Sequence, residues 1–179
     1  MFRIVKDTEK SIRLRCEKVE LPLKDEDKKL LTKMLDYLIK SQDEEYANAH
    51  NIRAGVGLAA PQIGVQKQML VIYYDNGESI TQYALVNPKI ISSSVKMCYL
   101  QSGEGCLSVD NDHKGYVYRP YKIRVKAYDF LTDKEIEIIA RGYDAIVLQH
   151  EIDHLSGVLY YDHIDKKNPF KILDNSIAL

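Results

Sequence analysis

The sequence predicts an α+β fold: a single domain in which antiparallel or mixed sheets surround a central metal-binding helix, with an amphipathic helix in the N-terminal part. Three observations lead to this prediction: a helical period early in the chain, short strand-like segments in the middle, and a second helical segment near the end. The 179 residues, 45% hydrophobic and 28% charged, suit one hydrophobic core. Because no linker-like stretch divides the chain, we expect residues 1–179 to form one domain.

The first helix is predicted over residues 24–50. Its apolar residues recur at three- and four-residue spacing between charged ones, at Leu30, Leu31, Met34, Leu35, Leu38 and Ile39. The acidic residues Asp25, Glu26 and Asp27 in its first turn suit the positive end of the helix dipole. This pattern indicates one amphipathic helix whose apolar face belongs to the core.

The middle of the chain indicates antiparallel sheet. Residues 54–64 are rich in Gly, Ala and Pro and predict a strand approach followed by a turn. Strand-like composition then occurs at residues 69–74, 83–88, 89–95 and 97–100. Residues 123–129 and 135–140 alternate around a turn at 131–133, which predicts a hairpin. A second helix is expected over residues 143–156, closed by Gly157, with a peripheral tail after Ile164.

Composition and charge exclude several classes of function. The formal net charge is −1, so no overall positive field attracts nucleic acid. No apolar run approaches the ~20 residues that cross a bilayer, and the first residues lack the apolar segment of a secretory signal. The three widely spaced cysteines, Cys16, Cys98 and Cys106, suit a reducing compartment. We therefore expect a cytoplasmic protein with free thiols that binds neither membranes nor specific nucleic acids.

A His-Glu-x-x-His motif lies on the second predicted helix. His150 and His154 are four residues apart, so both imidazoles project from one helix face and can reach one ion. Glu151 can approach the open position of that ion without binding it, as a general base does. The alternative is a helix whose His and Glu side chains merely face solvent.

A catalytic metal site of this kind needs a third protein ligand. His163 follows the helix too closely for the longer spacing of common metalloproteases, and no Glu occurs after Glu151. Cys106 is the natural candidate, because the small residues around it in residues 103–108 allow sulfur and backbone to approach an ion. Cys98 lies in an apolar strand, and we interpret it and Cys16 as structural.

Three motifs in order resemble the signatures of peptide deformylases: GVGLAAPQ at residues 55–62, EGCLS at 104–108 and QHEIDHL at 149–155. The resemblance extends weakly over nearly the whole chain. The segment between the first two motifs and the ending GVLYYDHID resemble the class common in low-GC Gram-positive bacteria. Residues 11–15 read SIRLR where the family often has a proline before its Leu-Arg pair, a departure that concerns local packing.

This resemblance implies a metal-dependent hydrolase that removes the formyl group from the N-terminal formyl-methionine of newly synthesised proteins. It implies one divalent ion on Cys106, His150 and His154: iron(II) in the cell, or zinc, nickel or cobalt in isolated protein. Glu151 would act as base and then acid. The Gln62 side chain and the Leu107 backbone N–H would donate to the oxyanion, and Glu104 would pair with Arg119.

The predicted substrate-binding residues lie within the first motif and shortly before the third. Gly57 would hydrogen-bond the main chain of an extended peptide. The methionine pocket would be lined by Val56, Leu58, Tyr143, Ile146 and Val147, all of which could instead be ordinary core residues. The partners implied are N-formyl-Met nascent polypeptides, with contact to the ribosome near its exit tunnel left open. The rivals are a metalloprotease and a binding module whose metal is purely structural, closed by four protein ligands.

Overall fold

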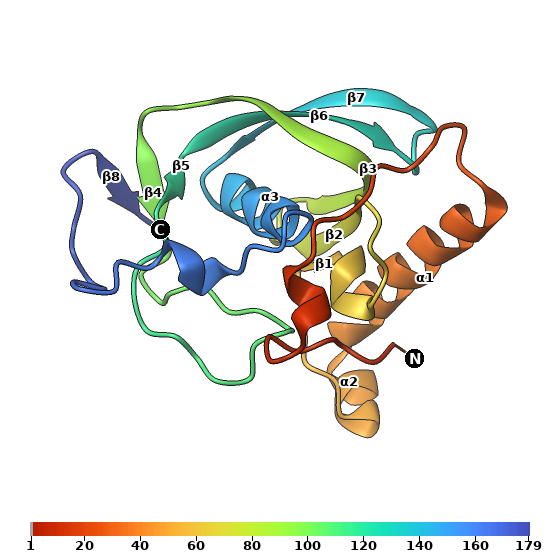
Figure 1. The fold of residues 1–179 in the computed structure, drawn as a ribbon, viewed down its shortest axis with the longest axis horizontal. Coiled ribbons are helices and arrows are strands. Elements are labelled where there is room, and N and C mark those ends of the chain that lie inside the picture. The colour runs from red at the N-terminus through yellow and green to blue at the C-terminus, as the bar shows by residue number, and fades with distance from the viewer. Residues whose placement is uncertain (1) are drawn as a thin grey trace.

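The computed structural model describes residues 2–179, which contain three α-helices and eight β-strands (Figure 1). The α-helices are α1 (Asp25–Ser41), α2 (Glu44–His50) and α3 (Tyr143–His154), and single 3-10 turns are η1 (Lys10–Arg13), η2 (Ala60–Ile63) and η3 (Tyr160–His163). The strands are β1 (Gly57–Ala59), β2 (Met69–Asp75), β3 (Ile80–Ser93), β4 (Met97–Tyr99), β5 (Arg119–Pro120), β6 (Lys122–Asp129), β7 (Lys134–Arg141) and β8 (Ser176–Ala178). The predicted α+β class is confirmed.

The strands form two sheets. The larger is antiparallel and has the order β1-β2-β3-β6-β7, and the smaller has the order β5-β4-β8 with β8 parallel to β4. The predicted hairpin is β6 and β7, where Asp129 pairs with Lys134 and its carboxylate accepts hydrogen bonds from Thr132. The runs predicted at 83–88 and 89–95 instead form one strand, β3, whose register shifts twice.

Strand β2 separates two hydrophobic clusters because successive side chains of a strand face opposite sides. Leu70 and Ile72 pack with Ala145 and Leu148 of α3. Met69 and Val71 pack on the other side, with the α1 residues Leu31, Met34 and Leu38. The larger sheet is therefore covered by α1 on one face and α3 on the other, and Figure 1 shows β6 and β7 curving over α3.

The prediction of one continuous helix over residues 24–50 is wrong, because α1 ends at Ser41 and a separate helix, α2, follows. Asp43 begins the second helix, and its carboxylate accepts a hydrogen bond from the Tyr46 backbone N–H. The Gln42 side chain donates to the carbonyl oxygens of Gly55 and Tyr73, at 2.8 and 2.6 Å. The interruption therefore ties the end of α1 to the backbone before and beside β1.

The end of α3 packs closely against the N-terminal segment. Gly157 has a φ of +72°, and a Cβ there would lie 2.2 Å from the Arg13 carbonyl oxygen, so both conformation and space require glycine. The tail predicted to be peripheral returns to the body of the protein through β8, which pairs with β4. Among the described helices, none is both long and apolar enough to cross a membrane.

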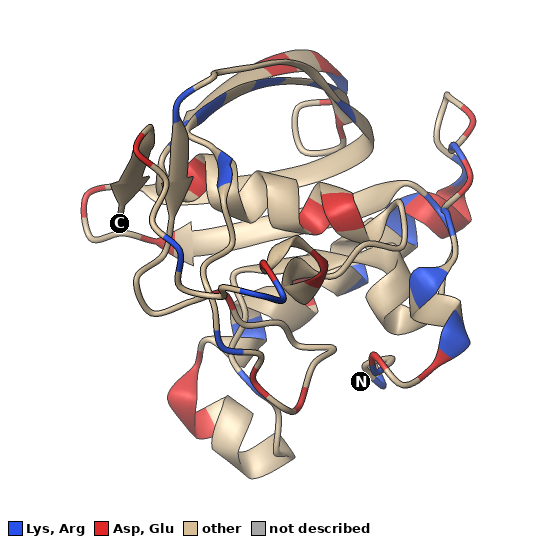
Figure 2. Ribbon diagram, turned by 60° about the vertical axis from the view of Figure 1, so that its left-hand side comes forward, with Lys and Arg blue, Asp and Glu red and all other residues tan. Residues whose placement is uncertain are grey.

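Basic and acidic residues are interspersed along α1 and along the β6–β7 hairpin (Figure 2). The exposed pairs Arg124–Glu137 and Lys126–Glu135 lie across the two hairpin strands. Such pairs contribute little to stability, since exposed ion pairs are worth about 0–1 kcal/mol. The one buried ion pair that bears on function lies beside α3 and is described below.

Candidate metal centre

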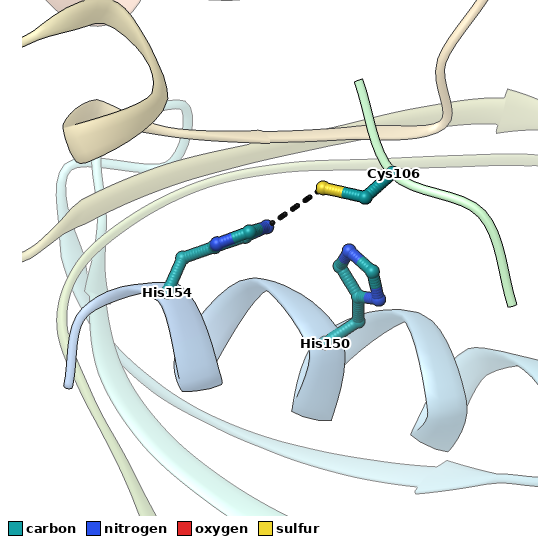
Figure 3. Close-up of side chains that lie close together, drawn as sticks. All are labelled: Cys106, His150 and His154. Atoms are coloured by element: carbon teal, nitrogen blue, oxygen red, sulfur yellow. Dashed lines mark hydrogen bonds between the residues drawn. The ribbon is translucent and has the colours of Figure 1, made fainter. Parts of the chain in front are cut away.

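Three side chains converge between α3 and the loop that follows β4 (Figure 3). His150 and His154 lie one turn apart on α3, with ring centroids 5.0 Å apart. Cys106 approaches them from the loop, and its Sγ lies 3.3 Å from His154 Nε2. The candidate ligand atoms of the three residues all lie within 4.8 Å of one another.

The charges of this group suit a metal ion. Burial alone raises the pKa of Cys106, but the imidazoles of His154 and His150 outweigh it and hold that pKa well below its ordinary value. Burial raises the pKa of Cys16 and of Cys98 to about 11, so these two buried cysteines are neutral thiols. A thiolate with two imidazoles is a donor set that binds zinc or iron(II), and three ligands leave one coordination position open.

The ring of His150 is oriented by a buried carboxylate. Its Nδ1 lies 2.8 Å from Glu104 Oε2, which leaves Nε2 for an ion. Burial lowers the pKa of His150, but its contacts with Cys106 and Glu104 outweigh burial and raise that pKa well above its ordinary value. The second imidazole differs, because His154 Nδ1 is buried and has no hydrogen-bond partner among the described residues.

Glu151 is buried beside the same group. Burial raises the pKa of its carboxyl, and its Oε2 has no hydrogen-bond partner among the described residues. The other oxygen packs against Gly57 of β1, where an added Cβ would lie 2.3 Å from Oε1. The absence of a side chain at Gly57 thus makes room for the glutamate, a reason that the sequence pattern does not reveal.

Gln62 has a fixed amide orientation. Its Oε1 accepts a hydrogen bond from the Ala59 backbone N–H at 2.8 Å, so its Nε2 faces the site. That nitrogen lies 3.5 Å from Cys106 Sγ and 3.3 Å from Ser108 Oγ. Leu107 directly follows Cys106 in the chain, and both are buried. Two separate loops therefore bring the predicted oxyanion donors to the cysteine.

A cavity of about 720 Å³ opens onto this group. Its lining includes five of the six residues predicted to bind substrate: Val56, Gly57, Tyr143, Ile146 and Val147. Leu58 is fully buried on the α1 side of the sheet, so its prediction as a pocket residue is wrong. Sequence reasoning missed Tyr74, which lines the cavity at the end of β2 and donates a hydrogen bond to Asp144. Residues 69–74 are apolar or aromatic throughout, so no alternation in the sequence marked Tyr74 as a cavity residue.

The sequence profile of the polypeptide deformylase family matches residues 1–170. This chain belongs to that family. It is 49% identical over 180 residues to peptide deformylase 2 of Bacillus subtilis, covering 100% of this chain and 97% of that protein. It is 47% identical over 177 residues to peptide deformylase of Oceanobacillus iheyensis, covering 98% of this chain and 96% of that protein.

Solved deformylase structures share the fold. The crystal structure of a peptide deformylase from Legionella pneumophila has a TM-score of 0.73 and 34% identity, covering 94% of this chain and 89% of that chain. That of peptide deformylase from Thermus thermophilus has a TM-score of 0.75 and 28% identity, covering 94% of this chain and 89% of that chain. The resemblance carried by the three sequence motifs is thereby confirmed at the level of the family.

A buried ionic network supports the candidate metal centre. Glu104 accepts two hydrogen bonds from Arg119, at 2.6 and 3.0 Å, and both side chains are almost fully buried. Arg119 also donates to Asp153, which contacts His163 at 2.7 Å. The Glu104–Arg119 pair was expected from the resemblance, whereas Asp153 and His163 were missed. Asp153 lies within the motif three residues after His150, which was the available signal.

We expect Glu104 and Arg119 to be strongly coupled. The single substitutions Glu104→Gln and Arg119→Met should each lower the free energy of unfolding by about 3–5 kcal/mol, since each removes the two-bond partner of a buried charge. The double substitution should lower the free energy of unfolding by much less than the sum of the two single effects, as measured by denaturant unfolding. The exposed pair Arg124–Glu137 is the control and should show coupling of about 1 kcal/mol or less. Additive effects at Glu104 and Arg119 would contradict the interpretation.

Proposed function

We propose that this chain, as one catalytic domain spanning residues 1–179, hydrolyses the N-formyl group of formyl-methionine at the start of newly synthesised polypeptides and releases formate. The observation that carries the proposal is the buried Glu151 carboxylate, whose Oε2 lacks a partner beside a thiolate and two imidazoles. The group contains three candidate ligands among the described residues, rather than the four of a closed structural site. We place the activity in the cytoplasm, where such chains are made, and contact with the ribosome stays a prediction.

Cys106, His150 and His154 would hold the divalent ion, and we propose iron(II) as the resident ion, with zinc, nickel or cobalt as substitutes. The donor set fits these ions, because thiolate and imidazole bind borderline and soft divalent metals. When bound, such an ion supplies Lewis acidity, which acidifies the attacking water and polarises the formyl carbonyl. The remaining steps belong to the protein's own side chains and backbone.

Glu151 would move the proton. As water adds to the formyl carbon, a carboxylate oxygen of Glu151 takes its proton, and the same carboxyl then passes that proton to the departing amine nitrogen. The C–N bond breaks, and formate and a free methionine amine are the products. Burial raises the pKa of Glu151, which makes it a stronger base than an exposed carboxylate.

Gln62 and Leu107 would stabilise the tetrahedral intermediate. The Gln62 Oε1 accepts a hydrogen bond from the Ala59 N–H, so the donor Nε2, which contacts Cys106 Sγ and Ser108 Oγ, faces the cysteine side of the cavity. The Leu107 backbone N–H belongs to the peptide unit next to Cys106. Donors that are already oriented in a buried site stabilise a developing oxyanion without further reorganisation.

The substrate's main chain would lie along β1. This strand is at the end of its sheet, with β2 hydrogen-bonded along one edge. An added peptide strand at Gly57 would be recognised through backbone groups, a mode that accepts many different sequences. The methionine side chain would enter the cavity lined by Val56, Tyr143, Ile146 and Val147.

Glu151→Gln should lower kcat for formate release from formyl-Met-Ala by about 10²–10⁴-fold, because the proton acceptor is lost. The bound metal should be retained, since Glu151 is not a proposed ligand. Glu135→Gln, at an exposed hairpin position, is the control and should match the parent protein. Cleavage of internal peptide bonds without formate release would instead establish the metalloprotease alternative.

Gln62→Leu should lower kcat by about 10²–10³-fold through loss of one oxyanion donor, with a smaller effect on the free energy of unfolding. Gln66→Leu is the matched control. The Gln66 side chain donates a hydrogen bond to the Ser11 carbonyl oxygen and accepts one from Cys16, and it forms no hydrogen bond with Cys106. We expect that variant to lose some stability but to keep its turnover. Equal turnover in both variants, measured with equal metal content, would remove Gln62 from the mechanism.

The three cysteines provide a direct test of the metal site. Cys106→Ala should lose the metal, whereas Cys98→Ala and Cys16→Ala should retain it, because their thiols are neutral and lie outside the ligand group. Elemental analysis of protein prepared without oxygen should find about one iron per parent chain. Full metal content in Cys106→Ala would refute the ligand set, and another resident metal would refute only iron(II).

A further inference from the structure

A short N-terminal segment, residues 5–7, bridges the two loops that carry Gln62 and Leu107. The Val5 backbone N–H donates to the Gln62 carbonyl oxygen at 2.8 Å, and the Asp7 N–H donates to the Ser108 carbonyl oxygen at 2.9 Å. Between them, Lys6 Nζ donates to the Leu107 carbonyl oxygen at 3.1 Å. Three successive residues therefore each hold a carbonyl group in one of the two loops.

The bridging segment is itself anchored. Val5 is buried with Ile12 and Leu159 in a small hydrophobic cluster. The Lys6 backbone N–H donates to Glu9, and its ammonium also pairs with Asp110 at 2.7 Å. The Lys6 ammonium is thus held between a carboxylate and the Leu107 carbonyl, with its side chain only 34% exposed.

We propose that Lys6 is a positioning residue for hydrolysis, which fixes the loop at Leu107 and thereby keeps its backbone N–H in place for the oxyanion. The inference rests on the proposed function, because it concerns one of the two proposed donors. The Leu107 carbonyl lies in the peptide unit that follows the one carrying the N–H, so the hydrogen bond from Lys6 limits the backbone torsions at Leu107. The peptide unit that carries the N–H is held by the Val109 N–H, which donates to the Cys106 carbonyl oxygen at 3.1 Å. The backbone N–H groups of Val5 and Asp7 hold the Gln62 and Ser108 carbonyls, and Lys6 is the side chain that holds the Leu107 carbonyl between them.

Lys6 acts behind the site rather than within it. It is not among the described residues that line the cavity, so substrate binding should not depend on it. Its effect should therefore fall on the transition state, where donor alignment matters most. A purely structural role would instead lower stability, metal content or substrate binding together with turnover.

The test compares Lys6→Met, Lys6→Arg and Lys10→Met in formate release from formyl-Met-Ala. Lys6→Met keeps the length of the side chain but removes the ammonium, and kcat should fall about 10–100-fold with KM within about twofold. Lys6→Arg keeps a cationic donor and should restore kcat to within about threefold of the parent. Lys10→Met, at an exposed position four residues later, should match the parent.

Metal content and thermal unfolding are measured for every variant. An unchanged kcat in Lys6→Met, or a loss of kcat that Lys6→Arg does not restore, would overturn the proposal. If Lys6→Met does not fold, Lys6→Gln carries the same expectation and the same criterion. If the proposed function is wrong, the parent protein releases no formate. If the parent is active and kcat of Lys6→Met is unchanged, only the role of Lys6 is contradicted.

Discussion

The structure depends on one electrostatic constraint: an anionic sulfur has to be stable in a buried position beside a buried carboxylate. A charge removed from water costs several kcal/mol unless partners compensate it. The imidazoles of His150 and His154 compensate the Cys106 thiolate and hold its pKa well below the ordinary value. Each imidazole must also be held in the right orientation. Glu104 holds the His150 ring, and Arg119 holds Glu104 and also donates to Asp153 at the end of α3.

Helix α3 can hold the two imidazoles beside the sulfur because one side of the helix packs in the core and another faces the cysteine loop. Ala145, Val147 and Leu148 pack it into the core against β2, while the two histidines face the cysteine loop. Asp153, on the last turn, accepts a hydrogen bond from Arg119 of β5 and so links the helix to the smaller sheet. A helix fixed on several sides cannot turn easily, and rigid placement is what a metal or catalytic group requires.

The sequence predicted features that depend on local pattern. The hairpin follows from alternation over adjacent residues, and the three motifs led to the family. The division between α1 and α2 was missed although the apolar period stops at Ile39, and the Gln42 contacts that fix it, with Gly55 and Tyr73, form only in the folded protein. Leu58 and Tyr74 show the same limit: burial on one face of β1 or β2 depends on which helix covers that face.

Glycine and lysine positions show why long-range contacts escape sequence reasoning. Gly57 suggests an open strand edge when seen alone, yet a Cβ there would collide with Glu151, which is 94 residues later in the chain. Lys6 looks like an ordinary surface charge, yet its ammonium reaches the Leu107 carbonyl across 101 positions. In both cases a residue much earlier in the chain limits how a catalytic group can move. Precision at the site therefore comes from contacts between distant segments, since the loops that carry Gln62 and Leu107 would otherwise be free to shift independently.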